Sequence, residues 1–207
     1  MFKLGVLVSG GGTNLQAIID NIENGRIKNA KIETVVSNVE DAYAIVRAKK
    51  HNINSVYINP KIYNSEKEYE NELIEHFKSF NVDLIILAGF MKILTNNFIK
   101  TYEGRIINIH PSLIPAFCGK GCYGLKVHEE VLKRGVKITG ATVHFVTEGA
   151  DEGPIIIQKA VEILDTDTPQ SLQKRVMEEA EWIIYSEAIK LIMENKIYIK
   201  DGNVKRR

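Results

Sequence analysis

The stretch KLGVLVSGGGTNLQAIIDNIEN, residues 3–24, determines the fold class expected for this chain. Its first part, residues 3–9, is an apolar run that predicts a buried β-strand. Apolar residues then recur at helical spacing over residues 15–22, which predicts a helix, and three glycines separate the two elements. A strand, a glycine loop and a helix in succession are typical of the first unit of an open α/β sheet.

Apolar runs and amphipathic helical segments alternate through the rest of the first half. Strands are expected at residues 32–37, 55–59, 83–89 and 105–110, and helices at residues 41–52 and 65–80. Ser65 is the expected N-cap of the second of these helices. The alternation predicts an open, mostly parallel, Rossmann-like sheet with helices on both faces and right-handed crossovers.

The second half has a different pattern. Residues 136–146 and 153–163 are two expected strands, joined by a link short enough for an antiparallel excursion of the sheet. Residues 168–195 predict one long helix that starts near Pro169, a residue favoured in a first turn. Asp201 and Gly202 predict a small closing hairpin. No repeat or linker interrupts the pattern, so residues 1–207 are expected to form a single domain.

The composition is that of an ordinary soluble globular protein. With 44% hydrophobic residues and a net charge of +1, it gives no electrostatic case for nucleic acid or membrane as a partner. No apolar run approaches the roughly 18 residues that a membrane span needs, and the N-terminus lacks a signal-peptide cleavage region. Cys118 and Cys122 are expected to be free thiols rather than zinc ligands, which favours a reducing cytoplasm.

The glycine loop is a candidate anion site. Backbone amides of Gly12, Thr13 and Asn14 at a helix N-terminus suit a phosphate, although Thr13 or Asn14 capping the helix would explain the pattern without a ligand. No Lys-Ser/Thr pair follows the loop, which excludes a nucleoside-triphosphate P-loop. Ser37 and Asn38 stand where a dinucleotide fold usually has a ribose-binding carboxylate, so a phosphomonoester is favoured over NAD.

A polar trio follows the later strands. Asn108 and His110 are two residues apart on one expected strand, so their side chains project from one face, and Asp151 lies in the turn between the two later strands. Each also has a structural explanation: Asn108 bonding loop backbone, His110 as a core histidine and Asp151 stabilising its own turn. The remaining histidines are expected to be structural: His51 and His76 on solvent-facing helix surfaces, His128 on a helix and His144 within a strand.

Five stretches carry a resemblance to a known family. VSGGGTNLQAII, LAGFMKIL, NIHPSLIPAF, TGATVHFV and DEGPIIIQ occur in the order and approximate spacing found in phosphoribosylglycinamide formyltransferases, folate-dependent enzymes of purine synthesis. The resemblance covers nearly the whole chain. NIHPSL with a downstream D-x-G-P is shared by formyltetrahydrofolate-using enzymes generally, whereas SGGGTN indicates the ribonucleotide branch.

The resemblance implies transfer of the formyl group of 10-formyltetrahydrofolate to the amine of glycinamide ribonucleotide, with no metal. Asn108, His110 and Asp151 match the catalytic trio, and Gly12, Thr13 and Asn14 the substrate-phosphate loop. Glu181 matches the substrate side. The folate pocket matches two segments: Met91, Lys92, Ile93 and Leu94, and Thr147, Glu148, Gly149, Ala150 and Asp151. Two small molecules are therefore the expected partners, and a homodimer is left open. Relatives often have proline at the position of Cys118 and a basic residue at that of Glu66, which Lys67 follows here.

The chemistry explains these residue types. When an amine attacks a formyl carbon, amide and imidazolium donors stabilise the charge that develops on the formyl oxygen. A nearby carboxylate raises an imidazole's pKa, so Asp151 is expected to keep His110 protonated. Met91, Ile93 and Leu94 suit an apolar slot for the flat pteridine, or else simple helix packing.

Three other functions share part of this pattern. A methionyl-tRNA formyltransferase usually has an added basic C-terminal domain, and a formyltetrahydrofolate hydrolase an extra N-terminal regulatory domain, neither of which is expected here. A non-catalytic binding module would take up both ligands and transfer nothing, and the intact trio argues against it.

Overall fold

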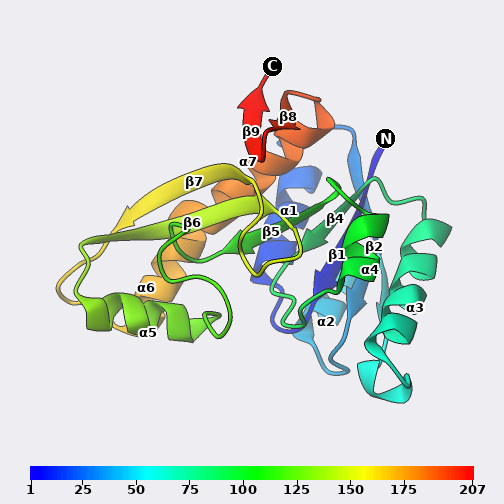
Figure 1. Ribbon diagram of the computed structural model, residues 1–207, viewed down its shortest axis with the longest axis horizontal. Helices are drawn as coiled ribbons and strands as arrows, with labels where there is room; N and C mark the ends of the chain where they lie inside the picture. The colour runs from blue at the N-terminus through cyan, green and yellow to red at the C-terminus, as the bar shows by residue number, and fades with distance from the viewer. The chain divides into compact units, whose positions relative to one another are not determined.

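The apolar run at the N-terminus forms β1 (Phe2–Val8), which pairs with a parallel strand on each side (Figure 1). The computed structural model describes residues 1–207, which fall into two units, residues 1–108 and residues 109–207. The strands form a seven-stranded sheet in the order β3-β2-β1-β4-β5-β6-β7. Strand β5 contains the boundary between the units, because its last two residues belong to the second.

The first unit alternates strands and helices. Its elements are β1, α1 (Thr13–Glu23), β2 (Ala30–Ser37), α2 (Tyr43–Lys50), β3 (Asn54–Tyr57), the 3₁₀ turn η1 (Pro60–Ile62), α3 (Glu66–Ser79), β4 (Leu84–Leu87), α4 (Asn96–Thr101) and the first part of β5 (Ile106–His110). All strand pairs from β3 to β5 are parallel, as the sequence predicts. The short helix α4 has no counterpart in the sequence prediction.

The chain reverses its direction across the sheet after β3. It moves outward from β1 to β2 and β3, then returns to place β4 on the other side of β1. With right-handed crossovers, α1 and α2 cover one face and α3 covers the other. The carboxyl ends of β1 and β4 therefore flank a topological switch point, where ligands bind in open α/β sheets.

Helix α3 packs closely on β1. A Cβ atom at Gly5 would come within 2.6 Å of the Phe77 ring, so the missing side chain makes room for this helix. The helix begins as predicted, because Ser65 is its N-cap and its side chain accepts a hydrogen bond from the amide of Glu68. The central strands are apolar and almost wholly buried, as expected for a sheet covered on both faces.

The second unit contains the antiparallel part of the sheet. Its elements are α5 (Leu125–Arg134), β6 (Ile138–Phe145), β7 (Ile155–Glu162), α6 (Pro169–Val176), η2 (Met177–Glu181), α7 (Trp182–Met193), β8 (Ile197–Lys200) and β9 (Asn203–Arg206). Strands β6 and β7 pair antiparallel, and β8 and β9 form the predicted hairpin around Asp201 and Gly202. The fold class predicted from the sequence is confirmed.

The predicted long helix is present but contains an irregular turn. It starts at Pro169, as expected, and continues through the π-helical turn η2 between α6 and α7. Figure 1 shows this helix, in orange, running along β6 and β7. Glu181 is the last residue of η2, and π-helical turns within helices are frequent at functional sites.

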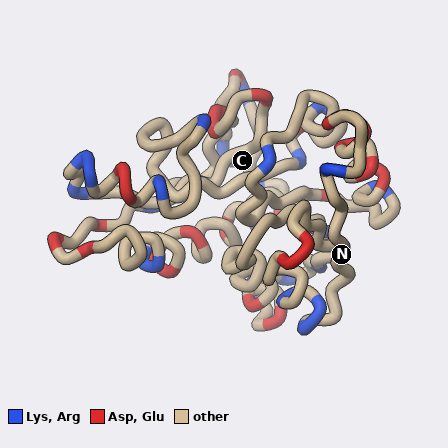
Figure 2. The backbone as a smooth tube through the Cα atoms, turned by 90° about the horizontal axis from the view of Figure 1, so that it is seen from below, with Lys and Arg blue, Asp and Glu red and all other residues tan.

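Basic and acidic residues are mixed along the backbone in Figure 2, in keeping with the net charge of +1. None of the helices combines the length and apolar character needed to cross a membrane. Both cysteines are free.

Candidate active site

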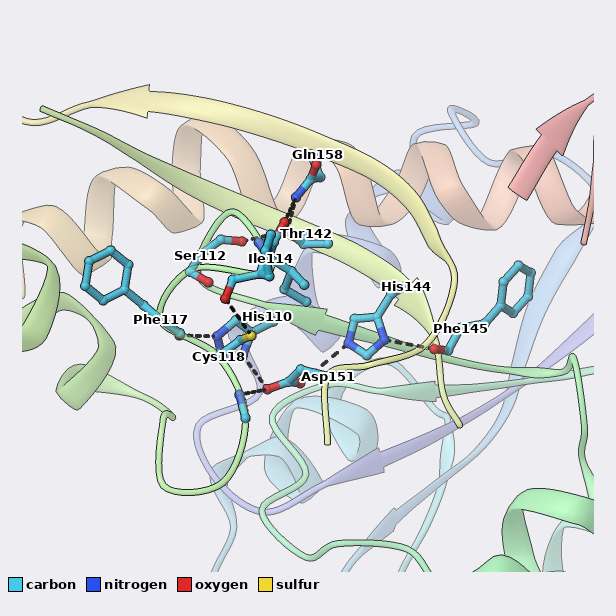
Figure 3. A network of polar contacts seen from close by, with 12 residues as sticks. His110, Ser112, Ile114, Phe117, Cys118, Thr142, His144, Phe145, Asp151 and Gln158 are labelled. Carbon is cyan, nitrogen blue, oxygen red and sulfur yellow. Dashed lines mark hydrogen bonds and ion pairs between the residues drawn. The ribbon is translucent and has the colours of Figure 1, made fainter. Parts of the chain in front are cut away.

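His110, the last residue of β5, is at the centre of a buried polar cluster in the second unit (Figure 3). Its ring has two polar neighbours. The Nδ1 atom lies 3.4 Å from Oδ2 of Asp151, and Nε2 lies 2.8 Å from the carbonyl oxygen of Phe117. The side chain is only 5% exposed, so both neighbours act on it in a largely water-excluded environment.

Asp151 reaches this cluster from the loop between β6 and β7. Its backbone is left-handed, with a φ of 61°, a conformation that aspartate tolerates better than most residues. Oδ2 accepts a hydrogen bond of 2.9 Å from the amide of Gly119, and Oδ1 lies 3.6 Å from Nε2 of His144. The other ring nitrogen of His144 lies 2.8 Å from the carbonyl oxygen of Phe145. The carboxylate is thus placed between two histidines.

Burial and charge act in opposite directions on this pair. Burial lowers the pKa of His110 more than the Asp151 charge and the Phe117 carbonyl raise it, so the net pKa is below the ordinary value. Burial would raise the pKa of Asp151, but His144, His110 and the Gly119 amide together hold it below its usual range. Asp151 therefore favours the charged imidazole, as the sequence predicts. The expectation that Asp151 keeps His110 protonated is not met, because desolvation outweighs the carboxylate in the net pKa.

The loop after β5 is fixed by side chains of the antiparallel strands. Thr142 Oγ1 donates to the carbonyl of Ser112 at 2.7 Å and accepts from the amide of Ile114 at 3.1 Å. Gln158 Nε2 donates to the carbonyl of Ile114 at 2.9 Å, as Figure 3 shows. The residues that follow in the loop direct backbone groups at the pair: the carbonyl of Phe117 faces His110, and the amide of Gly119 faces Asp151.

In the first unit, the glycine loop turns sharply into α1. Gly12 is the N-cap residue and has a φ of 70°, a left-handed conformation that favours glycine. It has no side chain to cap the helix, so neither Thr13 nor Asn14 occupies the capping position. Helix α1 starts at Thr13, and Asn14 is buried. An N-terminus of this kind directs backbone amides toward a bound anion.

Residues 91–94 lie beside the same switch point. The hydroxyl of Ser9, at the end of β1, donates to Asn38 at 2.6 Å and accepts from the amide of Met91 at 2.8 Å. Met91 is 52% and Ile93 62% exposed, whereas Leu94 is buried. The segment is a loop, so packing within a helix does not explain the two exposed apolar side chains. Lys92 pairs with Glu66 at 2.7 Å.

Two further predicted residues lie on regular elements of the fold. Asn108 is on β5 in the first unit, two residues before His110 on the same strand. Glu181 is a buried carboxylate at the end of η2 in the second unit. No three histidine, cysteine, aspartate or glutamate side chains are grouped so as to hold a metal ion.

Comparison with known proteins identifies the family to which the chain belongs. The formyl transferase family model matches residues 2–189. The chain belongs to the formyl transferase family. It is 41% identical to the phosphoribosylglycinamide formyltransferase of Haemophilus influenzae, over 98% of this chain and 92% of that protein. The chloroplastic phosphoribosylglycinamide formyltransferase of Arabidopsis thaliana is 37% identical, over 98% of this chain and 69% of that protein.

A solved structure agrees with this assignment. The glycinamide ribonucleotide transformylase 1 of Symbiobacterium toebii superposes with a TM-score of 0.93 and 42% identity, covering 100% of this chain and 94% of that one. The fold of that transformylase therefore extends over the whole length of this chain.

Several members of this polar cluster are not predicted by the sequence. His144 is expected to be structural, yet it faces the carboxylate of Asp151. The position of this histidine on β6, seven residues before an aspartate in the following loop, is the signal that could have identified it. The Phe117 carbonyl and the Gly119 amide give no sequence signal, because any residue supplies these groups.

The other three histidines are outside the cluster. His76 was expected to face solvent, but it is half-buried and lies 2.8 Å from the hydroxyl of Thr34, because α3 packs on the sheet at this point. His51 follows α2 and pairs with Glu23 at 2.7 Å. His128 on α5 is fully buried.

Proposed function

We propose that this protein transfers the formyl group of 10-formyltetrahydrofolate to the amine of glycinamide ribonucleotide, in purine biosynthesis. The observation that carries the proposal is the buried His110–Asp151 pair, with 3.4 Å between Nδ1 and Oδ2. Similarity over nearly the whole chain to relatives named for this reaction supports it.

Formyl transfer places specific demands on the residues around the formyl group. An amine attacks the formyl carbon, and negative charge develops on the formyl oxygen. Hydrogen-bond donors held ready around that oxygen stabilise the charge, which is often the largest contribution to acyl-transfer catalysis. In our proposal the donors are the side-chain amide of Asn108 and the imidazole of His110. Alternation along β5 gives both side chains the same face of the strand.

The two ring nitrogens of His110 then have separate roles. Nδ1 faces Asp151, which orients the ring and stabilises its charged form. Nε2 is the nitrogen left to serve the formyl oxygen. The carbonyl of Phe117 lies 2.8 Å from this nitrogen, in the position that the formyl oxygen takes over in our proposal. When the bond between the formyl carbon and the folate nitrogen breaks, that nitrogen gains a proton and tetrahydrofolate leaves. Asp151 suits the relay, through water, of the proton that the attacking amine loses.

The ligands are assigned to loops of both units, as the family resemblance implies. Gly12, Thr13 and Asn14 hold the phosphate of the ribonucleotide. Glu181 lies on the side of the site that binds the ribonucleotide in this proposal. The exposed apolar side chains of Met91 and Ile93 suit the flat pteridine of the folate. The second folate segment is residues 147–151. Its last residue is Asp151, whose carboxylate faces His110.

The partners in this proposal are two small molecules, with no nucleic acid, membrane or metal. The net charge of +1 gives no electrostatic case for a nucleic-acid partner, and two free cysteines support a reducing cytoplasm.

One assay tests the proposal. Purified protein is mixed with 10-formyltetrahydrofolate and glycinamide ribonucleotide, and the release of tetrahydrofolate and formylated ribonucleotide is followed. We expect both products in equal amounts, and neither when the ribonucleotide is omitted. Release of formate without an acceptor would instead indicate a hydrolase, and transfer to methionyl-tRNA a tRNA formyltransferase. Binding of both ligands without turnover would indicate a binding module. Each of these three results contradicts the proposal.

A further inference from the structure

Helix α2 holds two successive carbonyls of the glycine loop. The amide of Ala44, in the first turn of α2, donates to the carbonyl of Gly10 at 3.0 Å. One turn later, Nε of Arg47 donates to the carbonyl of Gly11 at 2.8 Å. The helix approaches this closely only because residue 12 lacks a side chain, since a Cβ atom at Gly12 would lie 2.7 Å from Cβ of Ala44.

These two bonds determine the direction of the next two amides. In a trans peptide the carbonyl of one residue and the N–H of the following residue point in opposite directions. The carbonyls of Gly10 and Gly11 point toward α2, so the amides of Gly11 and Gly12 point away from it. Neither amide donates to a backbone carbonyl of the chain. Successive amides turned outward at a helix N-terminus form an anion-binding concavity.

Arg47 also ties the loop to the helix that follows it. Its Nη1 atom donates to Oε1 of Gln16, in the first turns of α1, at 3.1 Å. The guanidinium lies 5.0 Å from the centroid of the Tyr43 ring, which restricts its rotation. The planar guanidinium of Arg47 thus joins Gly11, in the glycine loop, to Gln16, in helix α1. Lysine has the charge but lacks this fork, so it can occupy only one of the two positions at a time.

We propose that Arg47 is a positioning residue of the phosphate site. It holds the peptide planes that direct the amides of Gly11 and Gly12 at the ligand, and its fixed positive charge favours an anion there. The inference rests on the proposed function for the identity of the ligand, a phosphomonoester of a glycinamide ribonucleoside. Arg47 acts through the loop rather than as a ligand in this proposal, since its Nε and Nη1 atoms donate to Gly11 and Gln16.

A purely structural role for Arg47 makes a different prediction. If Arg47 only ties α2 to the rest of the unit, its loss should impair every substrate equally. If it arranges the phosphate site, its loss should impair only the substrate that carries a phosphate. The ribonucleoside that lacks the phosphate therefore separates the two roles.

The experiment compares glycinamide ribonucleotide with glycinamide ribonucleoside on three variants. Arg47→Met removes the donors and the charge but keeps most of the side-chain stem, and Arg47→Lys keeps the charge without the fork. Lys49→Met is the matched control, because it removes the same charge from an exposed position on the same helix. For Arg47→Met we expect the kcat/KM of the ribonucleotide to fall roughly ten- to a hundredfold, mainly through KM. Arg47→Lys should be intermediate, and Lys49→Met close to the parent protein.

The kcat/KM of the ribonucleoside should fall less than about threefold in every variant. It has no phosphate, so it cannot lose binding energy when the phosphate site is disturbed. Equal losses for ribonucleotide and ribonucleoside would overturn the inference, as would an equal effect of Lys49→Met. A second measurement does not depend on the reaction. Titration with inorganic phosphate should shift the amide NMR signals of Gly11 and Gly12 in the parent protein and not in folded Arg47→Met. Unchanged phosphate binding in that variant would also overturn the inference. Absence of formyl transfer in the parent protein would refute the proposed function, whereas the phosphate titration would still test Arg47.

Discussion

The Nδ1 atom of His110 lies 3.4 Å from Oδ2 of Asp151, and the two side chains are also connected through the loop that faces them. Oδ2 accepts from the amide of Gly119, and two residues earlier the Phe117 carbonyl faces Nε2 of His110. The imidazole and the carboxylate are thus linked directly and by three residues of backbone. A change in one side chain should therefore alter the protonation of the other.

Asp151→Asn should lower the pKa of His110 further. Burial already lowers this pKa, and the Asp151 charge is the largest contribution that raises it. Without that charge the imidazolium loses its proton at lower pH, and the basic limb of the kcat/KM profile should move in the same direction. NMR titration of the His110 ring and kinetics across pH measure the two effects. Glu152→Gln, which removes a carboxylate one residue away, is the control. A His110 titration that is the same in Asp151→Asn and in the parent protein would contradict this account.

Gly12→Ala should weaken ribonucleotide binding and leave folate binding nearly unchanged. Its new Cβ atom would lie 2.7 Å from Cβ of Ala44, at a residue whose φ of +70° already disfavours side chains. We expect the KM for the ribonucleotide to rise roughly tenfold or more, since small displacements of a positioning group have large effects. Gly10→Ala is the matched control, because nothing lies within 4 Å of a Cβ atom there. Equal weakening of both ligands in Gly12→Ala, measured by titration, would count against the phosphate assignment.

His128 should make the fold sensitive to acid. Its side chain is fully buried, and neither ring nitrogen has a hydrogen-bond partner. Burial, with a smaller contribution from His110, lowers the pKa of His128 to about 4, from 6.5 in an unfolded chain. The unfolded state therefore binds this proton first, and stability is lost as the pH falls from about 6.5 toward 4.

His128→Leu should remove that contribution. Between pH 7 and pH 4, the parent protein should lose roughly 3 kcal/mol more unfolding free energy than the variant. Urea denaturation at a series of pH values provides the comparison. Parallel stability curves for the two proteins would show that His128 does not titrate on unfolding.

The sequence predicted the elements of this fold well because its signals are local. Alternating apolar runs, the Ser65 cap and the Asp201-Gly202 turn each specify their own neighbourhood, and the structure has all three. The π-helical turn at Met177–Glu181 was not predicted, since it depends on how a helix packs rather than on its apolar period.

The same limit applies to the candidate site. Its side chains were named from residue types at strand ends, and the pairing of His110 with Asp151 agrees with that expectation. The effect of Asp151 on the pKa of His110 was predicted, but the larger effect of burial was not, because the degree of burial depends on the surrounding tertiary structure. The role of Arg47 was missed for a related reason: its partner is a backbone carbonyl 36 residues away in the chain, and any residue would supply that group.

The central claim is that Asn108 and His110 stabilise the charge on the formyl oxygen. It is tested most directly by single-turnover rates of Asn108→Ala, His110→Ala and the double variant at saturating concentrations of both substrates. Because that charge exists only in the transition state, the losses should appear in the rate of the chemical step rather than in binding. We expect each single variant to lose roughly a hundredfold or more, and the double variant less than the product of the two losses. Thermal unfolding and folate titration of the same proteins establish that they are folded and bind ligand. A folded His110→Ala protein that binds folate and transfers formyl at a near-normal rate would contradict the account.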